Sequence, residues 1–238
     1  MFWPPLAARE RIGYRPFRLS EYKIVAGWVT LPTHMILRRL LLAPLAIAIC
    51  VGLLPRARGQ EVDAPATVRS LCDALLAAMK QGSALNFAAR RQLLDPVIRR
   101  DLDLAFMTRI VVGPTWRGLP PTDRQQLVDA FSDFSIATYT ERFKSYSGER
   151  FDVDPSPAPQ PSGDCIVHTK LFTGRPEPVQ LDYLLRRSGD QWRIIDVYLN
   201  GTISEMAARR SEYSATLREG GAAALVDLLR KKVVELGG

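Results

Sequence analysis

The stretch VQLDYLLRRSGDQWRIIDVYL, residues 179–199, decides the fold of this chain. It contains two runs rich in apolar and aromatic residues on either side of Ser188-Gly189-Asp190, a pattern typical of a β-hairpin. Alternation predicts one shared face in the first run, made of Val179, Leu181, Tyr183 and Leu185. The same rule predicts one shared face in the second run, made of Trp192, Ile194, Asp196 and Tyr198.

Working outward from the hairpin, residues 165–172 predict a further strand, which a turn at 173–178 connects to the hairpin. Phe151 and Val153 alternate with aspartates and predict a short strand, and the Pro-rich residues 155–163 predict a loop. Consecutive strands with short connections favour an antiparallel meander.

Helical periodicity surrounds this meander on both sides. The helices expected before it cover residues 64–81, 87–98, 101–112 and 123–146, and those after it cover 204–218 and 222–236. Thr67 is the expected N-cap of the first helix, and Thr122 with Gln125 forms a capping-box pattern. Helices, then a meander, then helices predict an α+β fold in which an antiparallel sheet packs against several helices.

A secretory signal peptide is predicted over residues 35–59. Arg38 and Arg39 precede an apolar run of about 15 residues, which is shorter than a membrane-spanning helix requires. Small residues at 57 and 59 favour cleavage before Gln60. An uncleaved anchor and a buried core helix are the alternatives. Residues 1–34 lack periodicity, so we expect translation to start at Met35, and residues 60–238 to form a single domain.

The formal net charge of +7 does not indicate nucleic-acid binding. Residues 1–59 hold nine Lys/Arg and two Asp/Glu, whereas residues 60–238 hold 23 of each. The excess positive charge therefore belongs to the part expected to be removed, and the remaining chain offers no net attraction for phosphate backbones.

Signals for catalysis, metals or cofactors are weak, and we predict none of the three. His168 is the only histidine after residue 59, and its place in a strand favours a core or sheet-surface role. Asp182 and Asp196 are the strand positions where a general base could lie. Cys72 and Cys165 could pair in an oxidising compartment or remain as buried thiols.

Apolar and aromatic side chains are abundant on facing elements. They can form a packed core, or they can line a cavity between sheet and helices that suits a lipid. The residues expected to contact such a lipid are Phe106, Trp116, Phe131, Phe134, Tyr139, Phe143, Leu181, Tyr183, Leu185, Trp192, Ile194 and Tyr198. Periodicity alone does not separate the core from the cavity.

Two blocks of the sequence resemble the MlaC family, also described as toluene-tolerance auxiliary proteins. The matching residues of the first block are Trp116-Arg117, Arg124-Gln125, Phe131, Phe134, Tyr139 and Tyr146-Ser147-Gly148. Those of the second are Tyr183, Trp192, Asp196, Val197, Gly201, Arg210, Ser211, Tyr213 and Gly221. The resemblance covers nearly all of residues 65–236, and the run at 209–213 looks most like the hopanoid-associated branch.

This resemblance implies a periplasmic carrier that holds lipid acyl chains between sheet and helices and serves outer-membrane homeostasis. It implies a phospholipid or a hopanoid as cargo, with an inner-membrane transporter complex and an outer-membrane lipoprotein complex as partners. The competing hypotheses are a small enzyme that uses the same cavity and a structural adaptor of an envelope complex.

Overall fold

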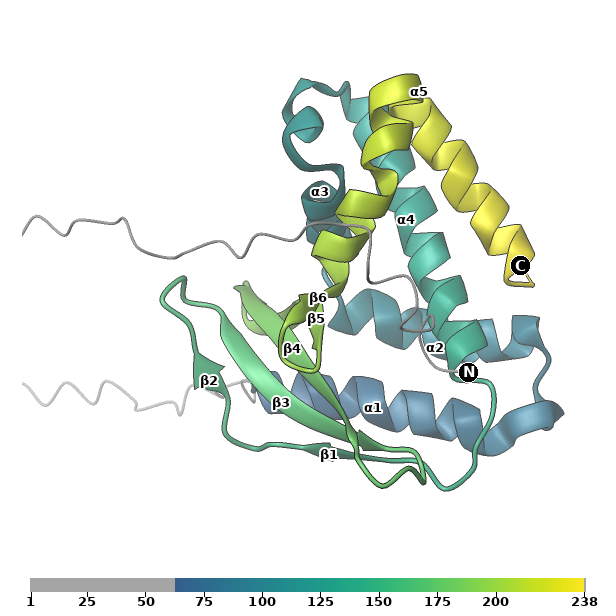
Figure 1. The fold of residues 1–238 in the computed structure, drawn as a ribbon, viewed down its shortest axis with the longest axis vertical. Coiled ribbons are helices and arrows are strands. Elements are labelled where there is room, and N and C mark those ends of the chain that lie inside the picture. The colour runs from purple at the N-terminus through teal and green to yellow at the C-terminus, as the bar shows by residue number, and fades with distance from the viewer. Residues whose placement is uncertain (1–62, 238) are drawn as a thin grey trace, which may run out of the picture. The chain divides into compact units, whose positions relative to one another are not determined.

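The computed structural model describes residues 63–237 (Figure 1). The predicted leader and signal peptide lie outside these residues. Within the described part, the α-helices are α1 (Ala64–Gln81), α2 (Phe87–Asp101), α3 (Leu104–Val112), α4 (Pro121–Arg142) and α5 (Glu205–Glu235). Two short 3-10 helices, η2 (Gly82–Ala84) and η3 (Gly113–Gly118), follow α1 and α3.

The strands form one antiparallel sheet with the order β1-β3-β4-β5-β6, and β2 pairs with β3. Their bounds are β1 (Arg150–Val153), β2 (Ala158–Pro159), β3 (Cys165–Phe172), β4 (Val179–Ser188), β5 (Gln191–Leu199) and β6 (Ile203–Ser204). The predicted meander of β3, β4 and β5 and the predicted strand at Phe151 are confirmed. The two-residue strands β2 and β6 were not predicted, because they are too short to show alternation.

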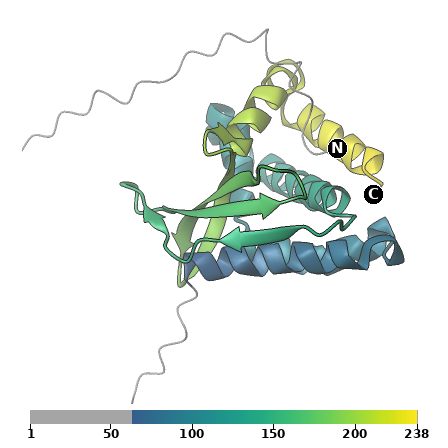
Figure 2. The same cartoon turned by 60° about the horizontal axis from the view of Figure 1, so that its bottom comes forward.

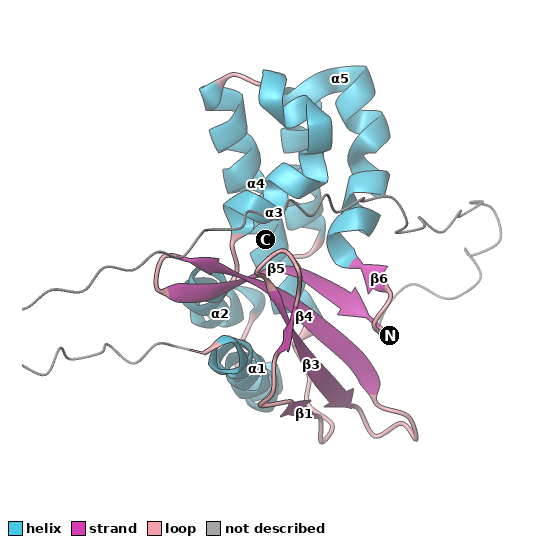
Figure 3. Cartoon of the chain, turned by 90° about the vertical axis from the view of Figure 1, so that its left-hand side faces the viewer, coloured by secondary structure: helices cyan, strands magenta, loops and turns pink. Residues whose placement is uncertain are grey.

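The helices gather in two groups around this sheet. In Figure 2, α1 runs alongside the strands, and it contacts β1, β3 and β5. In Figure 3, α3, α4 and α5 stand together beyond the sheet, and these three helices contact one another. Helix α2 joins the two groups through contacts with α1 and α4. The predicted α+β architecture is therefore confirmed.

The N-terminal caps differ from those expected. Asp63 caps α1 by accepting a hydrogen bond from the Ala66 N–H at 2.6 Å. Thr67 lies one turn inside the helix, where its hydroxyl donates to the Trp192 carbonyl at 3.1 Å. Helix α4 begins at Pro121, because a proline at the first helical position loses no hydrogen bond. The Thr122 capping-box prediction is therefore wrong.

The C-terminal ends show where local signals are weak. Helix α4 ends at Arg142, before the predicted end at Tyr146. Helix α2 continues through Pro96 to Asp101. Helix α5 is interrupted where Gly221 adopts φ +67° and ψ −158°, a conformation that is essentially restricted to glycine. Helix α5 therefore consists of two successive helical segments, as predicted. Ser204 caps the first of them.

A β-bulge in β5 overturns the predicted face of this strand. Leu184 pairs with Asp196, but the next residue, Leu185, pairs with Ile194, so Ile195 is the extra residue. A bulge shifts the alternation by one position. Trp192 and Ile194 therefore face the helices, while Asp196 and Tyr198 lie on the opposite face, and the prediction that all four share a face is wrong.

The chain just before α3 contacts β5 at the bulge. The Ile194 carbonyl accepts a hydrogen bond from the Asp103 N–H at 2.9 Å. Leu102 forms an isolated parallel bridge with Ile194. The bulged strand thus binds the connection between α2 and α3, which fixes the helical layer to this edge of the sheet.

An ion pair between Asp164 and Arg186 joins the start of β3 to β4. The buried Asp164 accepts two hydrogen bonds from the Arg186 guanidinium, each at 2.9 Å. Arg186 lies 4.2 Å from the centroid of the Phe106 ring, so it also links β4 to α3. The hydrogen bonds from Arg186 lower the pKa of the Asp164 carboxyl below its ordinary value.

We expect Asp164→Asn to reduce the free energy of unfolding by about 1 kcal/mol at neutral pH, since Arg186 is partly exposed. Because the folded-state pKa lies below the unfolded one, this stabilisation is present above the unfolded pKa. It is lost as the pH falls through the folded pKa. Urea unfolding of both proteins at about pH 7 and about pH 3 measures the difference. Asp227→Asn, on the exposed side of α5, is the control; an equal difference at both pH values would contradict the prediction.

Candidate functional site

The inner face of the sheet is a continuous apolar surface covered by helices. Register places Val167 beside Tyr183 and Cys165 beside Leu185. It then places Tyr183 beside Val197 and Leu185 beside Ile194. Directly opposed residues of antiparallel strands lie on the same face. Of these, Val167, Leu185 and Ile194 have no measurable exposure.

An aromatic seam lies where helices α1 and α4 meet strands β1 and β4. We define it as Cys72, Tyr139, Phe143, Phe151 and Tyr183. The Tyr139 and Phe143 rings stack at 5.9 Å between centroids, and the Phe143 and Phe151 rings lie 6.3 Å apart. The Cys72 thiol lies within hydrogen-bonding reach of the Tyr183 hydroxyl. The seam therefore brings together residues from four elements that are far apart in sequence.

Burial keeps the seam uncharged. Loss of solvent raises the pKa of the Cys72 thiol to about 12. It also raises the pKa of Tyr183 well above its ordinary value, and the pKa of Tyr139 in the same direction. These groups are neutral at physiological pH, so the seam presents an apolar surface with a few hydroxyl and thiol groups.

Thr169 is a polar exception on the inner face of the sheet. Its side chain is 1% exposed and its hydroxyl has no hydrogen-bond partner in the described part of the chain. A buried hydroxyl without a partner has a free-energy cost. Thr169 pairs with Leu181, so this donor lies among apolar side chains.

Both cysteines in the described residues are free and buried. Of the two alternatives for Cys72 and Cys165, the structure has the buried thiols. Their high pKa favours the thiol over the reactive thiolate, so neither has the character of a catalytic nucleophile.

Most of the residues predicted to contact a lipid lie in the interior. Those facing the helices from the sheet are Leu181, Tyr183, Leu185, Trp192 and Ile194. Those on α4, or directly after it, are Phe131, Phe134, Tyr139 and Phe143. Trp116 lies in η3, half-buried against the core, with Arg124 5.7 Å from its ring centroid.

Two of the predicted residues lie elsewhere. Phe106 is half-buried between the guanidinium groups of Arg109 and Arg186, at 4.6 and 4.2 Å from its ring centroid. Tyr198 lies on the outer face of the sheet, paired with Asp182. Conversely, sequence reasoning missed Cys72 and Phe151 as members of the seam. The alternation of β1 was a signal for Phe151, and the helical spacing of Cys72 beside Leu71 and Leu75 was a weak signal for Cys72.

The outer face of the sheet carries the only arrangement that resembles catalytic machinery among the described residues. His168 Nδ1 lies 3.0 Å from Asp182 Oδ1, and the Gln180 amide donates to the other carboxylate oxygen at 2.8 Å. A carboxylate can orient an imidazole, but triad chemistry also requires a nucleophilic hydroxyl or thiol at its other nitrogen. Within residues 63–237, no hydrogen bond joins His168 to such a group. This agrees with the expected sheet-surface histidine.

Asp196 has a structural role. Its carboxylate accepts hydrogen bonds from the Ser204 hydroxyl at 2.5 Å, the Met206 N–H at 3.1 Å and the Val197 N–H at 2.8 Å. Burial raises the pKa of this carboxyl. Because both of its oxygens accept hydrogen bonds from the protein, it connects β5 to the start of α5.

Two other kinds of feature are absent from the described residues. Among them, no cluster of three His, Cys, Asp or Glu side chains could hold a metal ion. A search of the same residues finds no helix with the length and apolar character needed to cross a bilayer.

The fold and the seam together define a class of protein: an α+β domain in which helices cover one face of an open antiparallel sheet and aromatic residues join the layers. Residues 69–231 match the family described as "MlaC protein". The chain belongs to the MlaC family. The predicted resemblance is thus confirmed at the level of the family, while the hopanoid-associated branch stays a prediction.

A solved structure shows the same fold. It is a phospholipid-binding protein from Ralstonia solanacearum, in complex with a phospholipid at 1.53 Å resolution. The two chains are 27% identical and superpose with a TM-score of 0.64. The match covers 74% of this chain and 99% of the other.

Proposed function

We propose that this protein is a periplasmic phospholipid carrier whose acyl tails bind between the inner face of the sheet and the helices, at the aromatic seam. The observation that carries the proposal is the apolar, uncharged seam in a chain of the MlaC family, whose fold is shared with a protein that holds a phospholipid. Each methylene removed from water contributes about 0.8 kcal/mol, so two tails can be held without covalent chemistry.

Binding at the seam requires the helical layer to move away from the sheet. Phe143 is 8% exposed and Tyr183 is 2% exposed, so their side chains already fill the space where α4 and the sheet meet. The tails would replace these contacts with contacts of similar apolar character. The segment 143–149, between α4 and β1, and the interrupted α5 are the places where such a separation needs least rearrangement.

The cellular role follows from the predicted signal peptide and the family. We place the carrier in the periplasm, where it exchanges lipid with an inner-membrane transporter complex and delivers to, or collects from, an outer-membrane lipoprotein complex. A hopanoid is the alternative cargo that the sequence suggests. The balanced charge of residues 60–238 suits a carrier that must leave an anionic membrane again.

Lipid extraction tests the proposal directly. The full-length sequence is expressed, the exported protein is purified, and the organic extract is analysed by mass spectrometry. We expect phospholipid in an amount comparable to that of the protein. Protein that carries no lipid and takes none from labelled vesicles would refute the proposal. If it then still purified with a membrane transporter, the adaptor hypothesis would be favoured.

Photo-crosslinking tests the location of the tails. A photoreactive benzoylphenylalanine at Tyr139, in the seam, is expected to form an adduct with bound phospholipid on irradiation. The same substitution at Tyr198, on the outer face of the same sheet, is the matched control and is expected to give none. Equal yields at both positions, or an adduct only at 198, would contradict specific binding at the seam.

A further inference from the structure

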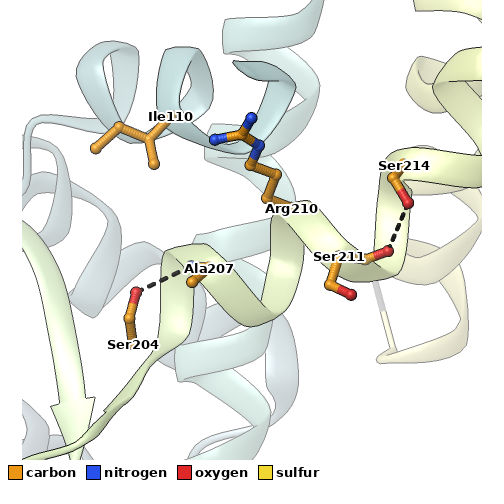
Figure 4. A pocket seen from close by; sticks show the side chains of 6 residues that line it. All are labelled: Ile110, Ser204, Ala207, Arg210, Ser211 and Ser214. Carbon is orange, nitrogen blue, oxygen red and sulfur yellow. Dashed lines mark hydrogen bonds between the residues drawn. The ribbon is translucent and has the colours of Figure 1, made fainter. Parts of the chain in front are cut away.

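A groove separate from the seam lies between α3 and the first half of α5. It has a volume of about 380 Å³, within the range of small-molecule sites. Figure 4 shows the side chains that line it: Ile110, Ser204, Ala207, Arg210, Ser211 and Ser214. None of these residues is among those predicted to contact a lipid. The groove therefore has one cation, three hydroxyl groups and one apolar wall.

Arg210 breaks the apolar stripe of α5. Met206, Tyr213 and Leu217 are buried on this helix at positions i, i+7 and i+11, and Arg210 occupies the i+4 position between them. Met206 is 3% exposed and Tyr213 is fully buried. The groove thus lies within one helical turn of core residues, at the rim of the apolar interior.

The positive charge of Arg210 has no partner among the residues that the structure describes. Its neighbour Arg209 pairs with Glu205 at 3.0 Å and with Glu212 at 3.1 Å. Arg210, by contrast, has no ion pair or hydrogen bond within residues 63–237. Arg210 is exposed at the edge of the core, so its guanidinium is accessible to an anion from solvent.

The end of α3 is shaped to receive this guanidinium. A Cβ built on Gly113 would lie 2.8 Å from Arg210 Nε, so any larger residue would displace the arginine. Gly113 also has φ +69°, which other residues rarely adopt. The Arg210 guanidinium therefore lies close against the Gly113 backbone, and it makes no hydrogen bond within residues 63–237.

The hydroxyl groups complete a site suited to phosphate. The Ser211 hydroxyl has no hydrogen-bond partner in the described part of the chain, and the Ser214 hydroxyl donates to the Ser211 carbonyl at 2.9 Å. Ser204 is already engaged by Asp196 and the Ala207 N–H, so it shapes the wall. A planar guanidinium beside hydroxyl donors matches the oxygens of a phosphate group.

We propose that this groove binds the phosphate of the cargo lipid and so selects phosphate-bearing lipids over neutral ones. The inference rests on the proposed carrier function. The tails would enter the interior past the α5 stripe, while the head group remains at the rim with Arg210. Free phosphate shares the same chemistry, and the experiment distinguishes the two sources.

The test compares wild type, Arg210→Gln and Arg218→Gln. Arg218 is an exposed arginine on the same helix, two turns away and outside the groove, so its variant controls for the change of charge. Each protein is incubated with phosphatidylcholine vesicles that contain either labelled phosphatidylglycerol or labelled diacylglycerol with the same tails. The lipid retained by the separated protein is then measured.

Arg210→Gln is expected to lower retention of phosphatidylglycerol about tenfold, equivalent to about 1.4 kcal/mol, and to leave diacylglycerol unchanged. Arg218→Gln is expected to change neither. An equal loss of retention for both lipids would assign Arg210 a structural role. Unchanged retention of phosphatidylglycerol would show that Arg210 does not bind the head group. Either result overturns the inference.

A titration with inorganic phosphate, followed by NMR, separates this inference from the carrier function. If wild type retains neither lipid, the carrier proposal fails and the lipid-selecting inference fails with it. Amide shifts at Ser211 and Ser214 that disappear in Arg210→Gln would then define a site for free phosphate. In protein that does retain lipid, the same shifts support the assignment of the groove.

Discussion

Cys72 in the native protein is expected to react with iodoacetamide about 1000-fold more slowly at pH 8 than an ordinary cysteine. Burial raises its pKa to about 12 from an ordinary value of 9.0, and only the thiolate attacks the reagent. Packing beneath Tyr183 in the seam blocks access as well. Peptide mass spectrometry reads Cys72 and Cys165 separately in the same sample.

The same reaction reports the opening of the seam. Acceptor vesicles are expected to increase labelling of Cys72, because the proposed lipid exchange would separate α1 and α4 from the sheet. Protein unfolded in guanidinium gives the fully exposed rate. A native rate within tenfold of the unfolded rate in the absence of vesicles would show that the seam is open in the resting protein and would contradict the packing described above.

Tyr213→Ala is expected to reduce the free energy of unfolding by about 3–5 kcal/mol, the loss typical of removing a large buried aromatic ring. Tyr213 is fully buried and makes an edge-to-face contact with Phe134 at 6.5 Å. A domain of this size has only about 5–15 kcal/mol of stability, so this variant loses a large share of it.

Tyr213→Phe is the matched variant. The Tyr213 hydroxyl is buried without a hydrogen bond of good geometry, so its removal is expected to change stability by less than about 1 kcal/mol. Urea denaturation followed by circular dichroism measures both variants. If the phenylalanine variant lost as much as the alanine variant, the hydroxyl would have a partner and the description of this part of the core would be wrong.

Elements with strong local patterns could be predicted from the sequence. The spacing of Val68, Leu71 and Leu75 was sufficient for α1, and the alternation around Ser188-Gly189-Asp190 was sufficient for the hairpin. The N-caps of the helices were harder to predict from the sequence. Asp63 and Thr67 are both good N-cap residues, and the choice between them depends on a tertiary contact, the hydrogen bond from Thr67 to the Trp192 carbonyl.

The candidate site was predicted in part for a related reason. Tyr139, Phe143 and Tyr183 stand out in the sequence as aromatic residues on apolar faces. Cys72 and Phe151 join them only because α1 and β1 pack at the same place, and no local sequence pattern predicts this contact. Arg210 was singled out by family resemblance alone, since its unpaired charge becomes visible only beside Gly113.

The bulge at Ile195 has a consequence for comparing this chain with its relatives. The number of residues between Trp192 and Asp196 determines which side chains enter the interior and which support the start of α5. A gap placed in this interval of an alignment would exchange the two sets and assign Asp196 to the apolar face. Alignments should therefore be anchored at both residues, and relatives that differ in length between them are expected to differ in their inner surface.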